Sequence, residues 1–258
     1  MRALNSTEIS NIRFAGEVLS KTFKFLAKEI KAGMTTMQIE ELADKFIKDN
    51  DCNPCFKGLH GYKYATCISV NEQIVHGMPR TDKVLNEGDI VSVDVGAGYN
   101  GMNTDACRTF GVGKISDEAQ RLIDETRNSF FEAVKVVKAG ALFGAISEAV
   151  EGYIKKNTPY SILENYFGHG IGKEVHLDPL IPNYKPNHPR LLTDARKKMV
   201  ENTAICIEPM ILAGKKDVKT AKDGWTVVSV DGKLTAHYEN TVLITKNGAE
   251  ILTNKFYD

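Results

Sequence analysis

Two aspartates in the first half of the chain are spaced so that their carboxylates could share a metal ion. Asp94 follows the apolar run 90–93, which is typical of a buried strand. An aspartate in such a place is costly unless it is paired, protonated or bound to a metal. Asp105 lies eleven residues later, across a Tyr-Asn-Gly turn, so the two side chains can lie opposite or diagonal on one face of a hairpin. The pair indicates a cation site, whereas either aspartate alone could equally be a turn or cap residue.

Three residues in the second half could supply further ligands. Glu208 directly follows the strand-like run 204–207, and Glu239 lies inside the strand-like run 236–244. His169 lies in G-H-G-I-G, where glycines on both sides allow close approach of the backbone. The alternatives are a solvent-facing strand glutamate and an incidental histidine in a glycine-rich turn.

One histidine and four carboxylates form an oxygen-rich donor set. Such a set suits Mn, Fe, Co or Zn in pairs and is a poor match for a structural zinc site. Two ions about 3.5–4 Å apart can hold a hydroxide at neutral pH and polarise a carbonyl. The donor types therefore predict a hydrolase.

An internal repeat indicates how these residues are brought together. Residues 31–50 align without a gap on residues 138–157, with eight of the twenty positions identical, and both segments have helical spacing. V-H-x-x-P follows at 75–79 and again at 175–179, and a strand-like run ending in a carboxylate comes later in each half. The pattern predicts an internal duplication; two similar helix hairpins with coincidental tails are the alternative.

The strand pattern predicts the fold class. Alternating or continuous apolar runs occur at 66–70, 90–95, 108–112, 204–207, 225–230 and 235–245. Because few of them alternate with helices, we expect an α+β fold with a mainly antiparallel sheet and helices on its outer face. No Pro/Gly/Ser-rich linker divides the chain. We therefore predict one catalytic domain, 1–258, with halves of roughly 6–115 and 116–253 related by a pseudo-two-fold axis.

Composition excludes several classes of protein. The 258 residues include 33 basic and 33 acidic side chains, so the net charge of zero gives no support to a nucleic-acid or membrane-surface partner. Neither an apolar run long enough for a membrane span nor a signal-peptide core is present, and five cysteines are too few for a secreted disulfide framework. A cytoplasmic protein is expected. Because no phosphate-loop motif occurs, a nucleotide-binding protein is unsupported.

The motifs around these residues resemble those of methionine aminopeptidases of type I, the bacterial kind. They are D-I-V-S-V-D-V-G with Asp94, N-T-D-A-C-R-T-F with Asp105, G-H-G-I-G with His169, I-E-P-M with Glu208 and Y-E-N-T with Glu239. The resemblance runs from about residue 6 to residue 253. It implies the pita-bread fold, with pseudo-two-fold halves, which agrees with the duplication.

The resemblance also implies a mechanism. The five residues would bind two divalent ions, Co, Mn, Fe or Zn, with Asp105 and Glu239 bridging. A dimetal-bound hydroxide would attack the carbonyl after the N-terminal methionine of a nascent polypeptide with a small second residue. Glu208 would carry the proton from the water to the leaving amine. His76 and His176 would contact the substrate amide and the tetrahedral intermediate; a structural histidine is the alternative for each.

The matching methionine-pocket positions are Tyr62, Cys67 and Trp225. Leu59 and Val175 stand where many relatives carry tyrosine and phenylalanine, which predicts a looser pocket. An added stretch, 181–194, would either reshape the groove rim or cover surface.

Other functions compete with this one. A proline-directed peptidase of the same fold would normally carry a separate N-terminal domain, for which 258 residues leave no room. A non-catalytic binding module of this fold would have lost its metals, whereas all five ligands are intact here. The resemblance further implies a monomer that needs neither nucleic acid nor membrane, with a transient contact to the ribosome.

Overall fold

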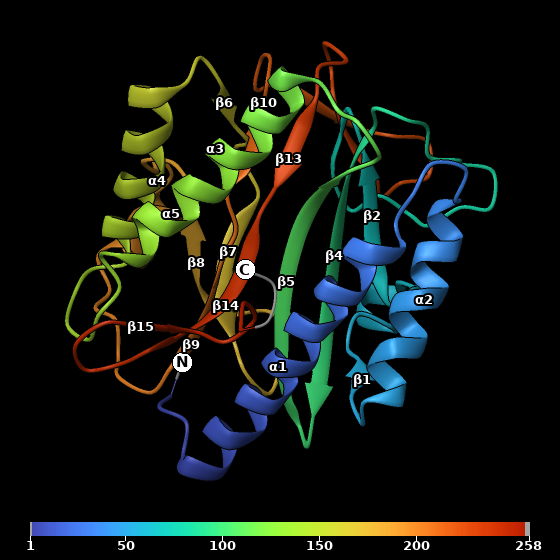
Figure 1. Cartoon of the computed structure of the whole chain (residues 1–258). Helices are drawn as coiled ribbons and strands as arrows, with labels where there is room; N and C mark the ends of the chain where they lie inside the picture. Colours follow the sequence, from blue (N-terminus) through green and yellow to red (C-terminus); the bar gives the residue numbers. More distant parts are fainter. Residues whose placement is uncertain (1, 256–258) are drawn as a thin grey trace.

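Two helix pairs form where the repeat predicts them. The first is α1 (Ser6–Glu29) with α2 (Thr36–Asp49), and the second is α3 (Asp117–Val134) with α4 (Gly144–Asn157). The computed structural model describes residues 2–255, so residues 1 and 256–258 of the predicted domain lie outside the described part. Figure 1 shows α1 and α3 lying in front of a long curved sheet. The division into two related halves stays a prediction.

The central sheet is antiparallel throughout. Within residues 2–255 it has nine strands in the order β1-β4-β5-β14-β9-β7-β8, with β2 added on β4 and β15 on β14. Every pairing in it is antiparallel, so the predicted fold class is confirmed. The bounds are β1 (Asn53–Pro54), β2 (Thr66–Val70), β4 (Ile90–Tyr99), β5 (Met102–Gly111), β7 (Phe167–Ile171), β8 (Leu177–Pro182), β9 (Ala204–Ile207), β14 (Glu239–Ile244) and β15 (Ala249–Ile251).

Shorter elements complete the described chain. One small sheet joins β13 (Thr235–His237), β10 (Met210–Leu212) and β6 (Ser161–Ile162), and another joins β11 (Val218–Thr220), β12 (Val227–Ser229) and β3 (Gln73–Val75). A 3-10 turn, η1 (Leu59–Gly61), and helix α5 (Pro189–Ala195) lie in connections.

Two predicted strand bounds were wrong, in ways that matter for the site. The strand predicted at 108–112 begins at Met102, because the hairpin stays paired down to its Asn100-Gly101 turn. Asp105 therefore lies inside a strand. The run 235–245 is divided at Tyr238 into β13 and β14, so that Glu239 is the first residue of β14.

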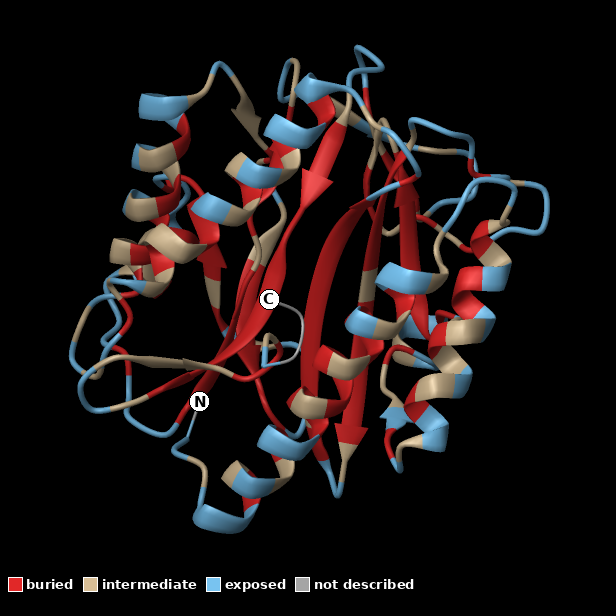
Figure 2. Cartoon of the chain, viewed as in Figure 1, coloured by how far each residue is buried: buried red, intermediate tan, exposed pale blue. Residues whose placement is uncertain are grey.

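Packing of the helices decides which strand face remains for the site. Ala15, Leu19 and Phe23 of α1 pack in one cluster with Val93 and Val95 of β4. Because side chains of a strand alternate between faces, Asp94 points to the face away from α1. Figure 2 shows the sheet as a continuous buried layer behind helices whose outer faces are exposed.

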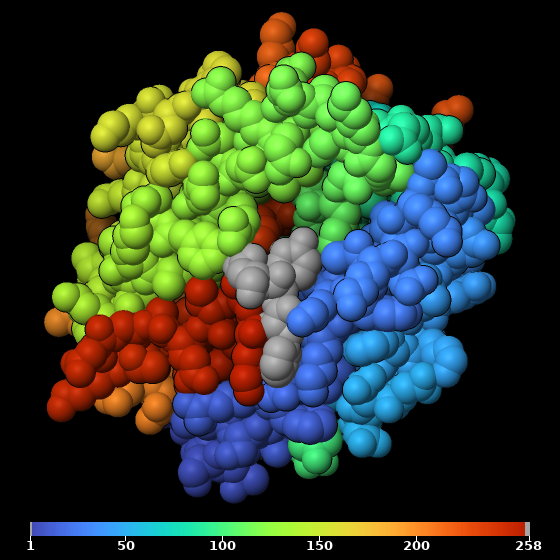
Figure 3. All heavy atoms as spheres, viewed as in Figure 1, coloured from blue at the N-terminus to red at the C-terminus, as the bar shows by residue number. Residues whose placement is uncertain are grey.

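Helices α3 and α4 also pack on the sheet. Phe130 of α3 and Ile146 of α4 share a cluster with Ile205 and Ile207 of β9 and Val242 of β14. From the viewpoint of Figure 1, α1, α3 and the C-terminal red segment cover this face of the molecule (Figure 3).

Within residues 2–255, no helix combines the length and apolar composition needed to cross a membrane.

Candidate metal centre

The β4–β5 hairpin brings Asp94 and Asp105 together. Asp94 is paired with Cys107 and Asp105 with Gly96, so the two aspartates are diagonal neighbours on one face. Asn100 and Gly101 form the two-residue turn with φ of 45° and 77°, the left-handed backbone that a tight hairpin requires. The predicted relation between the two aspartates therefore follows from the hairpin register.

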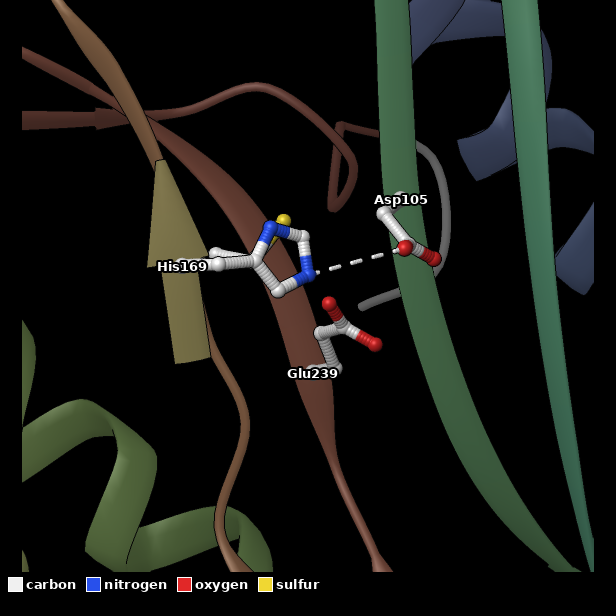
Figure 4. Close-up of side chains that lie close together, drawn as sticks. Asp105, His169 and Glu239 are labelled. Atoms are coloured by element: carbon white, nitrogen blue, oxygen red, sulfur yellow. Dashed lines mark ion pairs between the residues drawn. The ribbon is translucent and has the colours of Figure 1, made fainter. Parts of the chain in front are cut away.

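Three other strands add the remaining donors. Glu239 opens β14 opposite Cys107, and Glu208 directly follows the last residue of β9. His169 is the middle residue of β7. Figure 4 shows His169, Asp105 and Glu239 pointing toward one another from three strands that are far apart in sequence. Ligand atoms of Asp105, His169 and Glu239, together with the sulfur of Cys206, lie within 4.8 Å of one another.

Burial and mutual repulsion make these carboxylates unusually hard to ionise. Burial raises the pKa of Asp94 to about 7. The pKa values of Asp105, Glu208 and Glu239 are also raised, first by burial and then by the charges of neighbouring carboxylates. A cluster of this kind is unstable as bare anions, and a cation between the carboxylates removes the repulsion.

Unpaired oxygen atoms at this cluster fit divalent metals. Oδ1 of Asp94, Oδ1 of Asp105 and Oε1 of Glu239 are buried and have no hydrogen-bond partner among residues 2–255. Leaving a buried charged oxygen unpaired costs free energy, so native proteins rarely retain one unless it has a ligand. Oxygen donors with one imidazole also match the chemistry of Mn, Fe, Co and Zn. The residues present therefore fit a pair of divalent ions.

His169 is oriented as a ligand of this kind. Its Nδ1 lies 3.0 Å from the carbonyl oxygen of Gly170, and because a carbonyl only accepts, Nδ1 carries the proton. Its Nε2 is then free to bind a metal, and lies 3.6 Å from Glu208 Oε1 and 3.9 Å from Asp105 Oδ2. Burial lowers the pKa of His169 to about 3, so the ring is neutral at neutral pH.

A cavity of about 480 Å³ opens over the cluster. Its lining includes all ten residues singled out by the sequence: Tyr62, Cys67, His76, Asp94, Asp105, His169, His176, Glu208, Trp225 and Glu239. The ring centroids of His176 and His169 are 4.5 Å apart. Burial lowers the pKa of His76 to about 4, and that of His176 in the same direction. Both histidines are therefore neutral donors at the cavity wall.

One end of the cavity is apolar. Tyr62 and Cys67, which line it, form a buried cluster with Val175, and Leu59 and Trp225 pack against this cluster. The rings of Tyr62 and Trp225 are 5.0 Å apart, and the Tyr62 hydroxyl donates to the carbonyl of Thr66 at 2.8 Å. This end could hold an unbranched apolar side chain.

The stretch 181–194 contributes to both the rim and the interior. Arg190 of α5 lines the cavity and pairs with Asp178 at 3.2 Å. Asn183 is fully buried, and its Nδ2 donates to the carbonyl of Glu208 at 2.8 Å. The stretch thus helps to position a cluster residue as well as cover surface.

Sequence reasoning missed His237. Its ring is 2% exposed and lines the cavity, and its Nε2 lies near the carboxylates of Glu208 and Glu239. The signal was available, because His237 precedes Glu239 by two residues in a strand-like run and period-two alternation can put both on one face.

Comparison with known proteins gives a consistent result. Residues 10–246 match the model of metallopeptidase family M24. A methionine aminopeptidase of Clostridium acetobutylicum is 45% identical over 250 residues, which cover 96% of this chain and 97% of that protein. Methionine aminopeptidase 1 of Bacillus subtilis is 42% identical over 248 residues, covering 95% and 96%. The crystal structure of a methionine aminopeptidase from Thermotoga maritima superposes with a TM-score of 0.93 at 40% identity, covering 99% and 100%.

Proposed function

The chain belongs to metallopeptidase family M24 and, within it, to the methionine aminopeptidases, and from this premise we propose how its residues act. The reaction is hydrolysis of the first peptide bond of a nascent polypeptide that begins with methionine and has a small second residue. Water is the second substrate, and the products are free methionine and the shortened chain.

The centre takes two divalent metal ions. Asp94, Asp105, His169, Glu208 and Glu239 would hold them, with Asp105 and Glu239 shared between the two. Bound ions of this kind lower the pKa of a coordinated water toward 7 and polarise the substrate carbonyl. Support comes from the unpaired buried oxygens of Asp94, Asp105 and Glu239.

Glu208 moves the proton. In this proposal its carboxylate takes a proton from the attacking water and delivers it to the amine that leaves. Its position supports this role, because it follows the end of β9 and lies on the cavity wall rather than in the middle of a strand.

Two histidines and the apolar end of the cavity orient the substrate. His76, which is half-buried, and His176, which is exposed at the cavity wall, would donate hydrogen bonds from neutral rings to the peptide amide and to the oxygen on which negative charge develops. Donors fixed in advance of the reaction are typically worth a few kcal/mol of barrier. Tyr62, Cys67 and Trp225 would enclose the methionine side chain, in keeping with their common apolar cluster.

A single observation carries the proposal. Two buried carboxylates, two half-buried ones and a correctly protonated imidazole meet in one cavity, and three of the carboxylate oxygens lack any partner in the described chain. A binding module that had lost its metals would have no reason to keep this costly cluster.

The test compares three peptides. Met-Ala-Ser, Ala-Ala-Ser and Met-Arg-Ser are incubated with the protein after chelation and again after Mn²⁺ or Co²⁺ is restored. We expect metal-dependent release of methionine from Met-Ala-Ser alone. Cleavage of Ala-Ala-Ser as well would show an open pocket at Leu59 and Val175, and no cleavage with any metal would support the binding-module alternative.

The cellular setting is also proposed. The chain would act in the cytoplasm as a monomer, near ribosomes where nascent chains emerge. With 33 basic and 33 acidic residues, contact with the ribosome would depend on a local patch rather than on net charge. Size-exclusion chromatography and co-sedimentation with ribosomes would test these two points.

A further inference from the structure

The carboxylate of Glu208 lies between two buried imidazoles. Its Oε1 is 3.6 Å from Nε2 of His169, and its Oε2 is 3.7 Å from Nε2 of His237. His169 has a role in the proposed centre as a ligand. His237 has none so far, although it is 2% exposed and its Nε2 lies 3.9 Å from Glu239 as well.

The ring nitrogen of His237 faces acceptors. Nε2 is buried without a hydrogen-bond partner among residues 2–255, and the ion-pair contacts that it makes within 4.0 Å, to Glu208 and Glu239, are to carboxylate oxygens. An ionised carboxylate can only accept, so a proton on Nε2 satisfies both sides of the contact. His169 differs, because its Nδ1 donates to Gly170 and its Nε2 keeps a free lone pair.

The backbone of His237 is held at both of its polar groups. Its N–H donates to Oγ1 of Thr109 at 3.0 Å, and the same hydroxyl donates to the His237 carbonyl at 2.9 Å. Oγ of Ser92 lies 2.8 Å from Thr109 Oγ1 and can donate to it. These hydrogen bonds, which run from β4 through β5 to β13, therefore fix the backbone from which the His237 side chain extends. A residue that positions another side chain needs such support.

We propose that His237 is a positioning residue: its Nε2–H, which faces Oε2 of Glu208 across 3.7 Å, closes to a hydrogen bond in the metal-loaded protein and holds that carboxylate in the orientation from which it moves the proton. The inference rests on the role proposed for Glu208. His237 itself touches neither substrate nor water in this account. Its effect is expected in the chemical step and not in substrate binding.

The test compares His237→Phe with His237→Gln. Phenylalanine keeps the bulk of the ring and removes the donor, whereas glutamine keeps an N–H of similar reach. Loss of a supporting hydrogen bond at a metal site typically costs about 10- to 100-fold, so we expect that loss in kcat for His237→Phe on Met-Ala-Ser. KM should stay within about twofold, and His237→Gln should recover kcat to within about fivefold of the unmodified protein. His188→Gln, on an exposed histidine outside the cavity, is the matched control.

Metal-binding measurements distinguish a positioning role of His237 from a role as a metal ligand. Mn²⁺ stoichiometry, measured by isothermal titration calorimetry, should be unchanged in His237→Phe. The proposal is overturned if His237→Phe keeps full kcat, if glutamine is as poor as phenylalanine, or if His237→Phe binds fewer metal ions, which would make His237 a ligand. An unmodified protein that releases no methionine would overturn the proposed function instead, and circular dichroism checks that each variant is folded.

Discussion

The candidate metal centre and the candidate methionine pocket share one cavity but are built differently. Asp94, Asp105, His169 and Glu239 lie on paired strands of the central sheet, and Glu208 is the residue after β9. Of the pocket residues, Cys67 lies on β2 of the same sheet, whereas Leu59, Tyr62 and Trp225, and Val175 in the same cluster, lie in turns and connections.

The backbone reflects this difference. The turn that carries Leu59 contains Gly58, His60 and Gly61 with φ of 91°, 50° and 84°, all in the left-handed region. Strand residues are fixed by ladder hydrogen bonds on both sides, whereas such a turn depends on local conformation. The candidate metal ligands thus lie on or directly beside the sheet, whereas most of the candidate pocket residues lie in the more adaptable turns and connections. Leu59 and Val175, the two departures noted from the sequence, fall in the adaptable part.

The largest expected effect is at the centre. Replacing Glu208 with Gln keeps the size of the side chain and removes the proton carrier, so methionine release should fall by about 1,000-fold or more. Steady-state kinetics on Met-Ala-Ser and circular dichroism measure turnover and fold. Glu201→Gln, on an exposed glutamate, is the control; turnover retained by the Glu208 variant would remove it from the mechanism.

The second-largest expected effect is at Glu40, whose contacts connect the two regions. Glu40 of α2 is 4% exposed and accepts from the N–H groups of Ala65 and Thr66 at 2.7 Å and 2.8 Å, which fixes the start of β2 and hence Cys67. Glu40→Ala leaves buried donors unpaired and should lower the free energy of unfolding by about 1–3 kcal/mol.

Urea denaturation of the metal-free protein measures the Glu40 effect. Glu41→Ala, on the exposed neighbouring residue of the same helix, should change stability by much less. Equal losses in the two variants would contradict a specific role for the Glu40 carboxylate.

The third-largest expected effect is a change in substrate preference, caused by a substitution in the apolar cluster of the pocket alone. Val175→Phe adds a ring to the apolar cluster and should raise the preference for Met-Ala-Ser over Ala-Ala-Ser by about tenfold. Metal stoichiometry should not change, because the centre is built on other elements. The ratio of kcat/KM values checks the first point, with Val200→Phe at a half-exposed surface position as control; an unchanged ratio would mean that Val175 does not limit the pocket.

The smallest effect is a pH dependence at His76. Burial, with a smaller contribution from the charge of His176, lowers the His76 pKa from 6.5 to about 4 in the folded state. Between these pH values the unfolded chain binds a proton that the folded chain does not, so this residue reduces stability as the pH falls from about 6.5 toward 4. Between pH 7 and pH 5 the contribution is up to about 1 kcal/mol, since the side chain is partly exposed.

His76→Gln should therefore lose less stability than the unmodified protein over this pH range. Urea midpoints at the two pH values give the difference, and His188→Gln should keep the original dependence. If His76→Gln and the unmodified protein lose the same amount of stability between the two pH values, the His76 ring is solvated in the folded state.

Prediction from sequence succeeded where chemistry is carried by residue type and local spacing. Asp94 and Asp105 could be paired because a hairpin relates nearby residues by a simple register. Glu208 and Glu239 could be named as candidates because a carboxylate next to an apolar run is costly. His237 and Asn183 could not be assigned roles, since each acts through Glu208, which lies 29 and 25 residues away in the sequence.

The sequence by itself determined the donor types, the antiparallel hairpin, the helix pairs and the family. These features depend on side-chain chemistry, on period-two and 3.6-residue patterns, and on motifs, all of which are local properties of a chain. Only the tertiary structure decided that β5, β7, β9 and β14 meet with their carboxylates and His169 on one face, and that His237 stands beside Glu208. Strand order and long-range register depend on how the helices pack across the whole sheet, and no local pattern contains that information.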